Sequence, residues 1–216
     1  MKRIYISISA VWLALSGMAF ASSPQAEQTR QVPSFDGIST SGAWDIDVRV
    51  GPAASVRITG PQDVLDRITT EVIDGNLVIG QKPHTNTHWY KSDPTPHVYV
   101  TVPVLKRYSA EGAGETTLHD VTGEQFALSF EGAGALTASG KLKSLNVSAH
   151  GAGELNLKGL QADDVTANLE GLGSIYLYAH QSLTASVNGI GSLTYYGHPA
   201  RMTRSVNGIG SVSAGD

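Results

Sequence analysis

The chain has 216 residues, of which 24 are glycine and none is cysteine, and charged residues make up only 16%. The absence of cysteine excludes disulfides, zinc–thiolate sites and thiol catalysis, and a net charge of −4 argues against the basic surface that nucleic-acid binding requires. Because 41% of the residues are hydrophobic, the composition is that of a globular chain and not of a disordered one. The composition leaves the role of the many glycines to be explained.

Residues 1–21 have the pattern of a secretory signal peptide. A basic pair, Lys2-Arg3, precedes an apolar stretch that ends in the small-x-small cleavage pattern Ala19-Phe20-Ala21. A membrane anchor is the alternative, but the apolar stretch is short for a span of ~20 residues. We therefore predict an exported protein of the periplasm, the medium or the cell surface, cleaved near Ala21-Ser22, with residues 22–34 as a flexible leader.

Residues 35–108 predict short strands joined by irregular connections. Apolar and polar side chains alternate with the period of a strand over residues 35–38, 43–51, 56–60, 72–79 and 97–103. Asp74-Gly75-Asn76 interrupts the fourth of these segments and predicts a tight turn or hairpin. We expect these elements to form irregular N-terminal coils or a cap, because the end of a stacked array needs one.

A polar segment with aromatic residues, residues 82–96, interrupts these strands. Loops on rigid scaffolds often carry function, and its two rings suit stacking on a sugar or on a partner surface. Its histidines could also coordinate a metal with a neighbouring Asp or His. The alternative is an exposed loop that folds over the flank of the fold and covers core residues. We predict no metal site and no cofactor, and as candidate binding residues we take His84, His88, Trp89 and Tyr90.

From residue 109 onward, the unit Ser-x-x-Gly-x-Gly recurs six times at intervals of 18–20 residues, with Asn replacing Ser once. Internal repetition at a fixed period indicates a repeat architecture. Because glycine adopts positive φ at little steric cost, we predict that these glycines form a structural turn at the same corner of every repeat. They are Gly112, Gly114, Gly132, Gly134, Gly151, Gly153, Gly171, Gly173, Gly189, Gly191, Gly208 and Gly210.

The side chains around each copy alternate as in strands, and no helical stripe is present. Two residues before the first glycine, the residue is always apolar: Ala110, Phe130, Ala149, Leu169, Val187 and Val206. One repeat cannot bury its apolar side alone, whereas stacked repeats form a continuous interior.

We therefore predict an all-β fold, a single-stranded parallel β-helix (solenoid) of ~19-residue coils with a less regular N-terminal β cap. The crossover rule favours a right-handed coil, and a propeller, with ~40 or more residues per blade, does not fit the period. One domain is expected over residues 35–216, with irregular coils at 35–108 and the six repeats at 109–216.

Tyrosines gather on neighbouring repeats, at positions 176, 178, 195 and 196. Tyr176 and Tyr178 share one strand parity and Leu177 takes the inner one, so both tyrosines should be exposed. An aromatic strip suits carbohydrate stacking or a homo-oligomer interface. The alternative is stacking between coils that stiffens the sheet. We add Tyr176 and Tyr178 to the candidate binding residues.

The acidic residues give no convincing catalytic set. The only adjacent acidic pair after the leader, Asp163-Asp164, would point to opposite sides of a strand and could not act as the paired carboxylates of a glycosidase. The residue before the first glycine forms a column that could bind Ca²⁺, stack as amides or face solvent, and we favour the last. The column is Glu111, Glu131, His150, Glu170, Asn188 and Asn207.

The order of these segments resembles a bacterial family, that of the putative auto-transporter adhesin, head GIN domain, over residues 35–213. The resemblance rests on the ordered combination of the Gly-x-Gly copies with Phe35-Asp36-Gly37-Ile38, Val56-Arg57-Ile58-Thr59-Gly60, Asp74-Gly75-Asn76-Leu77-Val78-Ile79 and Val100-Thr101-Val102-Pro103. It implies an extracytoplasmic β-helix with no established enzymatic activity.

Together these features predict an exported, non-catalytic module for binding or for adhesion-like contact at the cell surface. Its expected partner is a surface glycan or a protein, with homo-oligomers as a further option, without nucleic acid and without a membrane span after signal cleavage. Two alternatives remain: a polysaccharide-active, pectinase-like β-helix enzyme and a purely structural envelope protein.

Overall fold

The computed structural model describes residues 25–82 and 95–215. These residues form one nine-stranded sheet and a four-residue helix, α1 (Gln62–Leu65). The strands are β1 (Gln25–Arg30), β2 (Gly37–Ala43), β3 (Asp45–Val50), β4 (Ser55–Pro61), β5 (Ile68–Ile73), β6 (Asn76–Gln81), β7 (His97–Val102), β8 (Arg107–Tyr196) and β9 (Arg201–Ala214).

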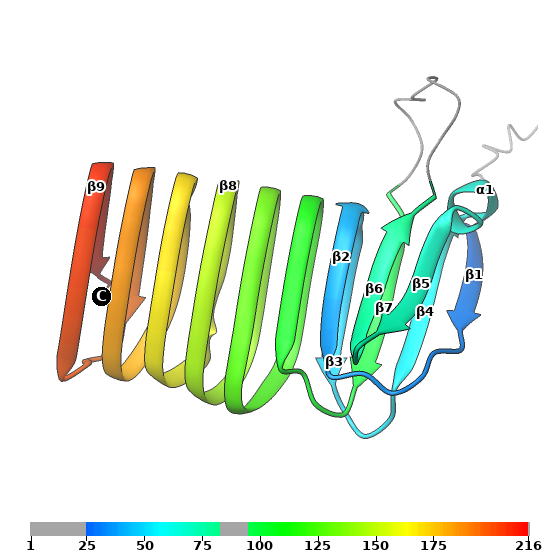
Figure 1. The fold of residues 1–216 in the computed structure, drawn as a ribbon, viewed down its shortest axis with the longest axis horizontal. Coiled ribbons are helices and arrows are strands. Elements are labelled where there is room, and N and C mark those ends of the chain that lie inside the picture. Colours follow the sequence, from blue (N-terminus) through cyan, green and yellow to red (C-terminus); the bar gives the residue numbers. More distant parts are fainter. Residues whose placement is uncertain (1–24, 83–94, 216) are drawn as a thin grey trace, which may run out of the picture.

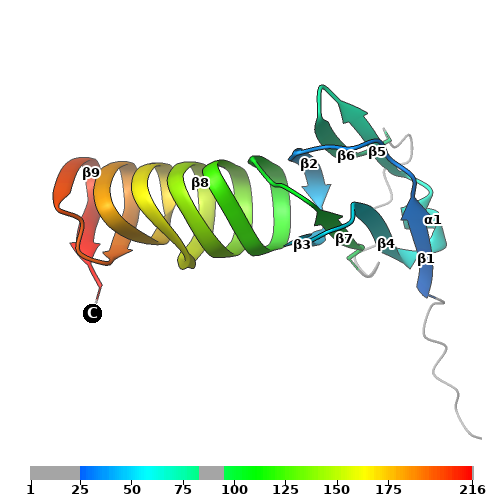
Figure 2. The ribbon, with the colours of Figure 1, turned by 90° about the horizontal axis from the view of Figure 1, so that it is seen from below.

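Strand β8 extends over 90 residues because its pairing is not interrupted from one Gly-x-Gly copy to the next. Figures 1 and 2 show its ribbon turning back in successive, side-by-side stretches, and we call each stretch from one copy to the next a pass. Strand β9 pairs in parallel with the last pass of β8, and β2 and β3 pair in parallel with the first. Equivalent positions of neighbouring passes therefore lie side by side.

The N-terminal part of the sheet is mixed, which corrects the predicted fold. Strand β1 runs antiparallel to β4, β4 antiparallel to β7, and β5 antiparallel to β6. The prediction of a single-stranded parallel β-helix is therefore wrong: the sheet is nearly closed and contains both kinds of pairing, although it is all-β. For β5 and β6 the physical reason is the short connection Asp74-Gly75, which can join only antiparallel neighbours. The pairs β1–β4 and β4–β7 are joined through much longer segments, so the tertiary arrangement sets their direction.

Two local findings accompany this correction. Residues 25–30, which the sequence assigned to a flexible leader, form strand β1. The turn between β5 and β6 has positive φ at both Asp74 (50°) and Gly75 (75°), which is the geometry of the tight hairpin turns that such residues favour. The tight turn predicted at this position is therefore confirmed.

A continuous apolar core lies inside the sheet, and one inner column contains Leu136, Leu155, Ile175 and Leu193, each at most 1% exposed. Complete burial of such a side chain contributes about 1.5–3 kcal/mol. The column expected two residues before each first glycine is also buried in the middle of the sheet, from Phe130 to Val187. At the C-terminal end it is not, since Val206 is 40% exposed.

The glycines of neighbouring passes lie directly against one another. A Cβ placed on Gly132 would lie 2.0 Å from the carbonyl oxygen of Gly112, and one on Gly151 would lie 2.3 Å from that of Gly132. The first glycine of every copy also has a positive φ, between 110° and 134°. Glycine is therefore required both by the backbone conformation and by the close approach of the next pass.

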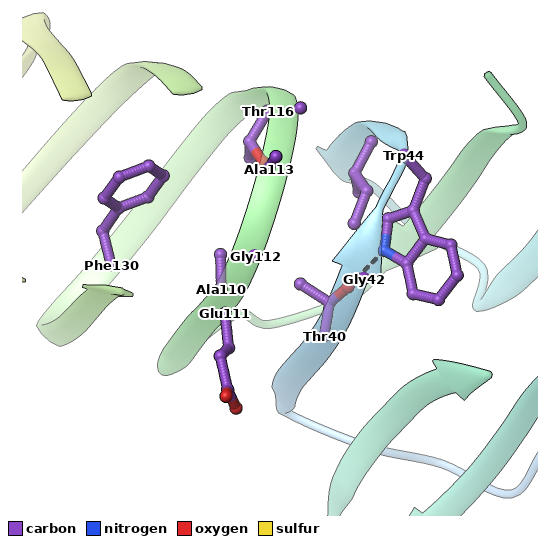
Figure 3. Close-up of a pocket in the computed structure, with 11 residues that line it drawn as sticks. Thr40, Gly42, Trp44, Ala110, Glu111, Gly112, Ala113, Thr116 and Phe130 are labelled. Carbon is purple, nitrogen blue, oxygen red and sulfur yellow. Dashed lines mark hydrogen bonds between the residues drawn. The ribbon is translucent and has the colours of Figure 1, made fainter. Parts of the chain in front are cut away.

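Strand β2 contains an earlier, imperfect copy of the motif that the sequence analysis missed. Because β2 pairs in register with the start of β8, Ser39-x-x-Gly42 lies beside the first Gly-x-Gly copy. Trp44 takes the place of the second glycine, and its Nε1–H donates to Thr40 Oγ1 at 2.6 Å (Figure 3). Trp44 is only 4% exposed, so its ring covers the core where the first corner begins.

Asp36 connects the start of β2 to the start of β8. Its carboxylate lies 2.7 Å from Lys106 Nζ and 3.1 Å from Arg107 Nη2, and its carbonyl accepts a hydrogen bond from the Lys106 N–H at 2.7 Å. The side-chain hydrogen bond from Lys106, followed by the charges of Lys106 and Arg107, lowers the pKa of the Asp36 carboxyl.

A lowered pKa predicts a defined loss of stability in acid. The contribution of the Asp36 contacts is complete above the ordinary carboxyl pKa of ~3.9 and is lost as the pH falls through the lower folded-state pKa. Asp36→Asn is expected to remove at most about 1 kcal/mol at pH 7, because the pairs are near the surface. The free energy of unfolding in urea at pH 7, 5 and 3 measures this, with Asp63→Asn as the control. Equal acid sensitivity of the wild type and Asp36→Asn would contradict the assignment.

Candidate functional site

The candidate binding residues of the sequence analysis fall into two groups. His84, His88, Trp89 and Tyr90 lie outside the described residues, and their role stays a prediction. Tyr176 and Tyr178 are half-buried on the outer side of β8, while the intervening Leu177 is fully buried (0% exposed). The two tyrosines thus lie on the face where the alternation places them, but only one of them belongs to a pocket.

Tyr178 lines a pocket of about 570 Å³ near the C-terminal end of the sheet. Two passes of β8 contribute tyrosines to this pocket, because Tyr178 precedes the last Gly-x-Gly copy of β8 and Tyr195 and Tyr196 follow it. Tyr176 is not among the lining residues. The full lining is Tyr178, Tyr195, Tyr196, Gly197, His198, Pro199, Met202, Ala214 and Gly215, and we call this the tyrosine pocket.

The turn after β8 brings these side chains together. Gly197 has a φ of 90°, and a Cβ there would lie 2.3 Å from the Ala179 carbonyl oxygen and 3.2 Å from the Tyr178 ring. Glycine thus lets the chain leave the sheet directly beside Tyr178. The Tyr196 ring is also held in place, because Lys158 Nζ lies 4.1 Å from its centroid in a cation–π contact.

The tyrosine pocket combines apolar and polar groups. Aromatic faces and the Met202 thioether provide apolar contact area, while the phenol hydroxyls and the His198 imidazole provide hydrogen-bonding groups. Apolar and aromatic walls with a few polar groups are typical of ligand sites. Among the described residues, those that line this pocket include no Asp or Glu.

A second groove, of about 510 Å³, crosses β2 and several passes of β8. Small polar side chains dominate its floor, and Asn76 and Arg107 are also among its lining residues. This groove was not predicted, although the Ser that opens most Gly-x-Gly copies was the signal for it. These polar residues are Ser39, Ser109, Ser129, Asn146, Ser148, Thr166 and Asn168.

The pocket in Figure 3 is very small. It has a volume of about 20 Å³ and lies between β2, β3 and the first passes of β8, beside Trp44, Thr40 and Thr116. A space of this size holds about one water molecule. We therefore treat it as part of the packing of the first corner and not as a ligand site.

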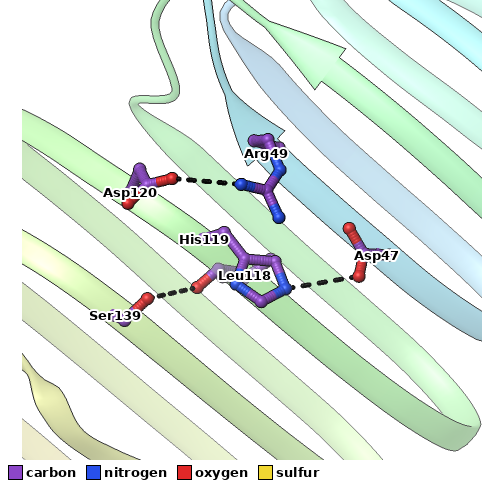
Figure 4. A network of polar contacts seen from close by, with 6 residues as sticks. All are labelled: Asp47, Arg49, Leu118, His119, Asp120 and Ser139. Carbon is purple, nitrogen blue, oxygen red and sulfur yellow. Dashed lines mark hydrogen bonds and ion pairs between the residues drawn. The ribbon is translucent and has the colours of Figure 1, made fainter.

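A polar cluster connects β3 to β8 (Figure 4). His119 Nε2 lies 3.3 Å from Asp47 Oδ2, and Arg49 Nη1 lies 3.5 Å from Asp120 Oδ2. The nearby Ser139 hydroxyl donates to a main-chain carbonyl of β8 at 3.5 Å. In a Ser-His-Asp triad the serine hydroxyl is hydrogen-bonded to the imidazole. Here Ser139 bonds to the main chain, so these residues form contacts between neighbouring strands and not such a triad.

The acidic pair considered for catalysis is engaged in structural contacts. Asp164 accepts a hydrogen bond from the Ser182 hydroxyl and lies 3.8 Å from Arg201 Nη2. These contacts connect one pass of β8 with the next and with β9. Asp163 and Asp164 are both half-buried and stand between the buried Ala162 and Val165, so the alternation is interrupted here and the expectation that the two carboxylates point to opposite sides of the strand is wrong.

Side chains in the column of residues that precede the first glycines also contact one another. His150 Nε2 lies 3.2 Å from Glu170 Oε2, and the Asn207 amide donates to the Asn188 carbonyl oxygen at 3.1 Å. Within residues 25–82 and 95–215, no three His, Asp or Glu side chains lie together in a group that could hold a metal ion. The described part of the column is therefore a set of exposed pairwise contacts.

A row of large apolar residues is exposed at the glycine corners of the last passes. The residue between the two glycines is Leu172, Ile190 and Ile209 in the last three copies, with exposures of 54%, 55% and 77%. In the first three copies this residue is alanine. Exposed apolar rows of this kind mark contact surfaces.

These features define a class of protein: a continuous all-β scaffold with open pockets on its surface. Within it, the chain belongs to the family described as "Putative auto-transporter adhesin, head GIN domain", whose sequence model matches residues 34–199. The resemblance noted in the sequence is therefore confirmed. The family description refers to adhesion and names no enzymatic reaction.

Solved structures of similar fold include proteins from Bacteroides and Parabacteroides species. A putative adhesin from Bacteroides fragilis is 20% identical with a TM-score of 0.72, covering 89% of this chain and 98% of its own. A putative lipid binding protein from Parabacteroides distasonis is 19% identical with a TM-score of 0.54, covering 89% and 97%. At these identities the similarity shows the fold alone. No curated protein matches the sequence.

In the part of the chain that the structure describes, no helix combines the length and the apolar character needed to cross a bilayer.

Proposed function

We propose that this protein is an exported, non-catalytic binding module of the cell surface that holds a carbohydrate chain in the tyrosine pocket. The observation that carries the proposal is the convergence of Tyr178, Tyr195 and Tyr196 on one pocket of about 570 Å³. The adhesin description of the family supports a role in surface contact.

Carbohydrate fits this pocket better than the other candidate ligands do. The C–H faces of a pyranose ring stack on aromatic faces, and its hydroxyls bond to phenol and imidazole groups. A purely apolar ligand would leave several of these polar groups without partners, which has a cost in binding. The pocket lies at the C-terminal end of the sheet, where the outward Tyr178 meets Met202 and Ala214 at the ends of inner columns. A polymer can therefore lie across this end of the sheet without threading through the core.

Export is the second part of the proposal. It is supported by the signal-peptide pattern of residues 1–21 and by the adhesin description of the family. Cleavage near Ala21-Ser22 leaves Gln25–Arg30 intact to form β1. Mass spectrometry of the mature N-terminus, from protein recovered outside the cytoplasm, tests the cleavage position.

Removal of two pocket tyrosines is expected to weaken glycan binding. Each aromatic contact contributes about 0.5–1.5 kcal/mol beyond area burial, so the double variant Tyr178→Ala, Tyr196→Ala should bind about tenfold more weakly or worse. The purified protein is first applied to an array of bacterial and host polysaccharides. The strongest glycan is then titrated by calorimetry against the wild type and the variants.

The chain offers a matched control in Tyr176→Ala. Tyr176 is half-buried on the same strand and face but does not line the pocket, so its removal should leave affinity unchanged. A wild-type protein that binds no glycan on the array refutes the proposed ligand class. Equal losses in Tyr176→Ala and the double variant refute the pocket as the site. Phosphatidylcholine vesicles form a separate arm, and binding to them alone would replace carbohydrate with lipid.

A further inference from the structure

Strand β9 is an edge strand of the sheet, paired along one of its two sides. Within the described residues it pairs with β8 alone, and Figure 1 shows it as the last ribbon at the C-terminal end. Its outer side presents the main-chain N–H and C=O groups of a 14-residue strand. An edge of this kind is a template for pairing with a further strand.

The side chains of β9 show which face such a strand would cover. Met202, Arg204 and Val206 pair in register with residues of β8 that point into the core and are at most 2% exposed: Leu183, Ala185 and Val187. The three β9 residues therefore stand at the ends of inner columns. Because no described strand covers them, Met202 remains 37% exposed and Val206 40%, and Arg204 is exposed as well.

Arg204 differs from the other residues of its column, which are buried. Four residues before the first glycine, every earlier copy has a buried residue, each at most 2% exposed: Tyr108, Leu128, Val147, Ala167 and Ala185. Only the last copy places a guanidinium there. An apolar strand laid over it would desolvate that charge without a partner, which is strongly unfavourable.

The same residue opposes pairing with a second copy of the chain. In the antiparallel register that pairs Met202 of one copy with Val206 of the other, Arg204 lies opposite Arg204. Like charges directly opposite each other in a sheet are destabilising. Arg201, on the alternate face, does not add to this repulsion because it lies 3.8 Å from the Asp164 carboxylate.

We propose that the outer edge of β9 is an interaction surface for an extended protein segment that places a carboxylate opposite Arg204, between two apolar side chains at alternate positions. Main-chain hydrogen bonds would supply affinity, and the alternate side chains would supply specificity, as in other strand additions. The carboxylate would neutralise the guanidinium while the apolar residues cover Met202 and Val206. Arg204 thus selects an acidic partner and excludes a second copy of this chain.

The test uses the chain itself as the probe. In Arg204→Glu, the same edge presents a carboxylate flanked by Met202 and Val206, so this variant has the chemistry of the proposed partner. Sedimentation velocity is expected to show monomers for the wild type alone and for the variant alone. An equimolar mixture is expected to form a heterodimer, which weakens in high salt because the pair is electrostatic.

Two further variants separate the edge from general charge effects. Arg204→Val removes the repulsion and is expected to self-associate at least tenfold more tightly than the wild type. Arg201→Glu makes the charge reversal on the same strand but on the alternate face, and its mixture with wild type should stay monomeric. Far-UV circular dichroism confirms that each variant keeps its strands.

The outcomes are decisive in each direction. A monomeric mixture together with monomeric Arg204→Val shows that the edge does not accept a strand and overturns the proposal. Association of wild type with Arg201→Glu to the same extent overturns the role of Arg204, and a dimeric wild type overturns the exclusion of a second copy. The variants change Arg204 and Arg201, which do not line the tyrosine pocket, although Met202 belongs to both surfaces.

Discussion

Gly132→Ala is expected to destabilise the protein by about 2–5 kcal/mol, because it combines conformational strain with overpacking. Gly132 has a φ of 134°, and a Cβ there would lie 2.0 Å from the Gly112 carbonyl oxygen. The obstructing atom belongs to the main chain of the neighbouring pass, so the methyl group cannot be accommodated by rotation of a side chain. Urea unfolding followed by circular dichroism measures the loss.

Gly123→Ala is the control that separates the two causes. Gly123 has a φ of 154°, but a Cβ there meets nothing within 4 Å. The control therefore retains the conformational cost of about 1 kcal/mol and lacks the clash. If both variants lose the same stability, close approach of the passes is not what requires glycine at the corners.

Trp44→Ala is expected to cost about 3–5 kcal/mol, the range for truncating a buried aromatic residue. Trp44 is 4% exposed, and its ring would lie 2.6 Å from a Cβ placed on Gly42. Removal of the ring leaves a cavity at the first corner, next to the existing space of about 20 Å³. The free energy of unfolding in urea, followed by the strand signal in circular dichroism, gives the magnitude.

Two milder substitutions test whether packing or hydrogen bonding dominates at this site. Trp44→Phe keeps much of the ring, and Thr40→Val keeps the shape of the partner, but both remove the hydrogen bond of 2.6 Å. Each is expected to cost about 1–3 kcal/mol, because one buried polar group is left without its partner. A loss as large as that of Trp44→Ala in both variants would show that the hydrogen bond, and not the ring, closes the corner.

Much of the strand pattern was predictable because alternation depends only on which residues are apolar. The parity that buries Leu177 and exposes its neighbours Tyr176 and Tyr178 follows from the strand period alone. The same reasoning failed at β2, where Trp44 in place of the second glycine concealed an additional copy of the motif. It also failed for β1, whose polar sequence becomes a strand only because β4 offers a pairing edge.

The tyrosine pocket was only partly predictable for a related reason. The aromatic residues were visible in the sequence, but Tyr178, Tyr195 and Tyr196 meet only through the pairing of successive passes and the turn at Gly197. Tyr176 has the same chemistry and the same face as Tyr178, yet it stays outside the pocket. Composition and period cannot distinguish two such residues, because the difference arises from the path of the chain after β8.

The sequence by itself determined the all-β character, the inner columns and the positions where only glycine fits. These depend on local alternation and on a motif repeated at a nearly constant interval. The tertiary structure decided the direction of strand pairing in the N-terminal half, the pockets and the unmatched charge of Arg204 at the edge of β9. Each of these depends on which distant strand becomes a neighbour, and that is set by the whole nearly closed sheet and not by any one of its segments.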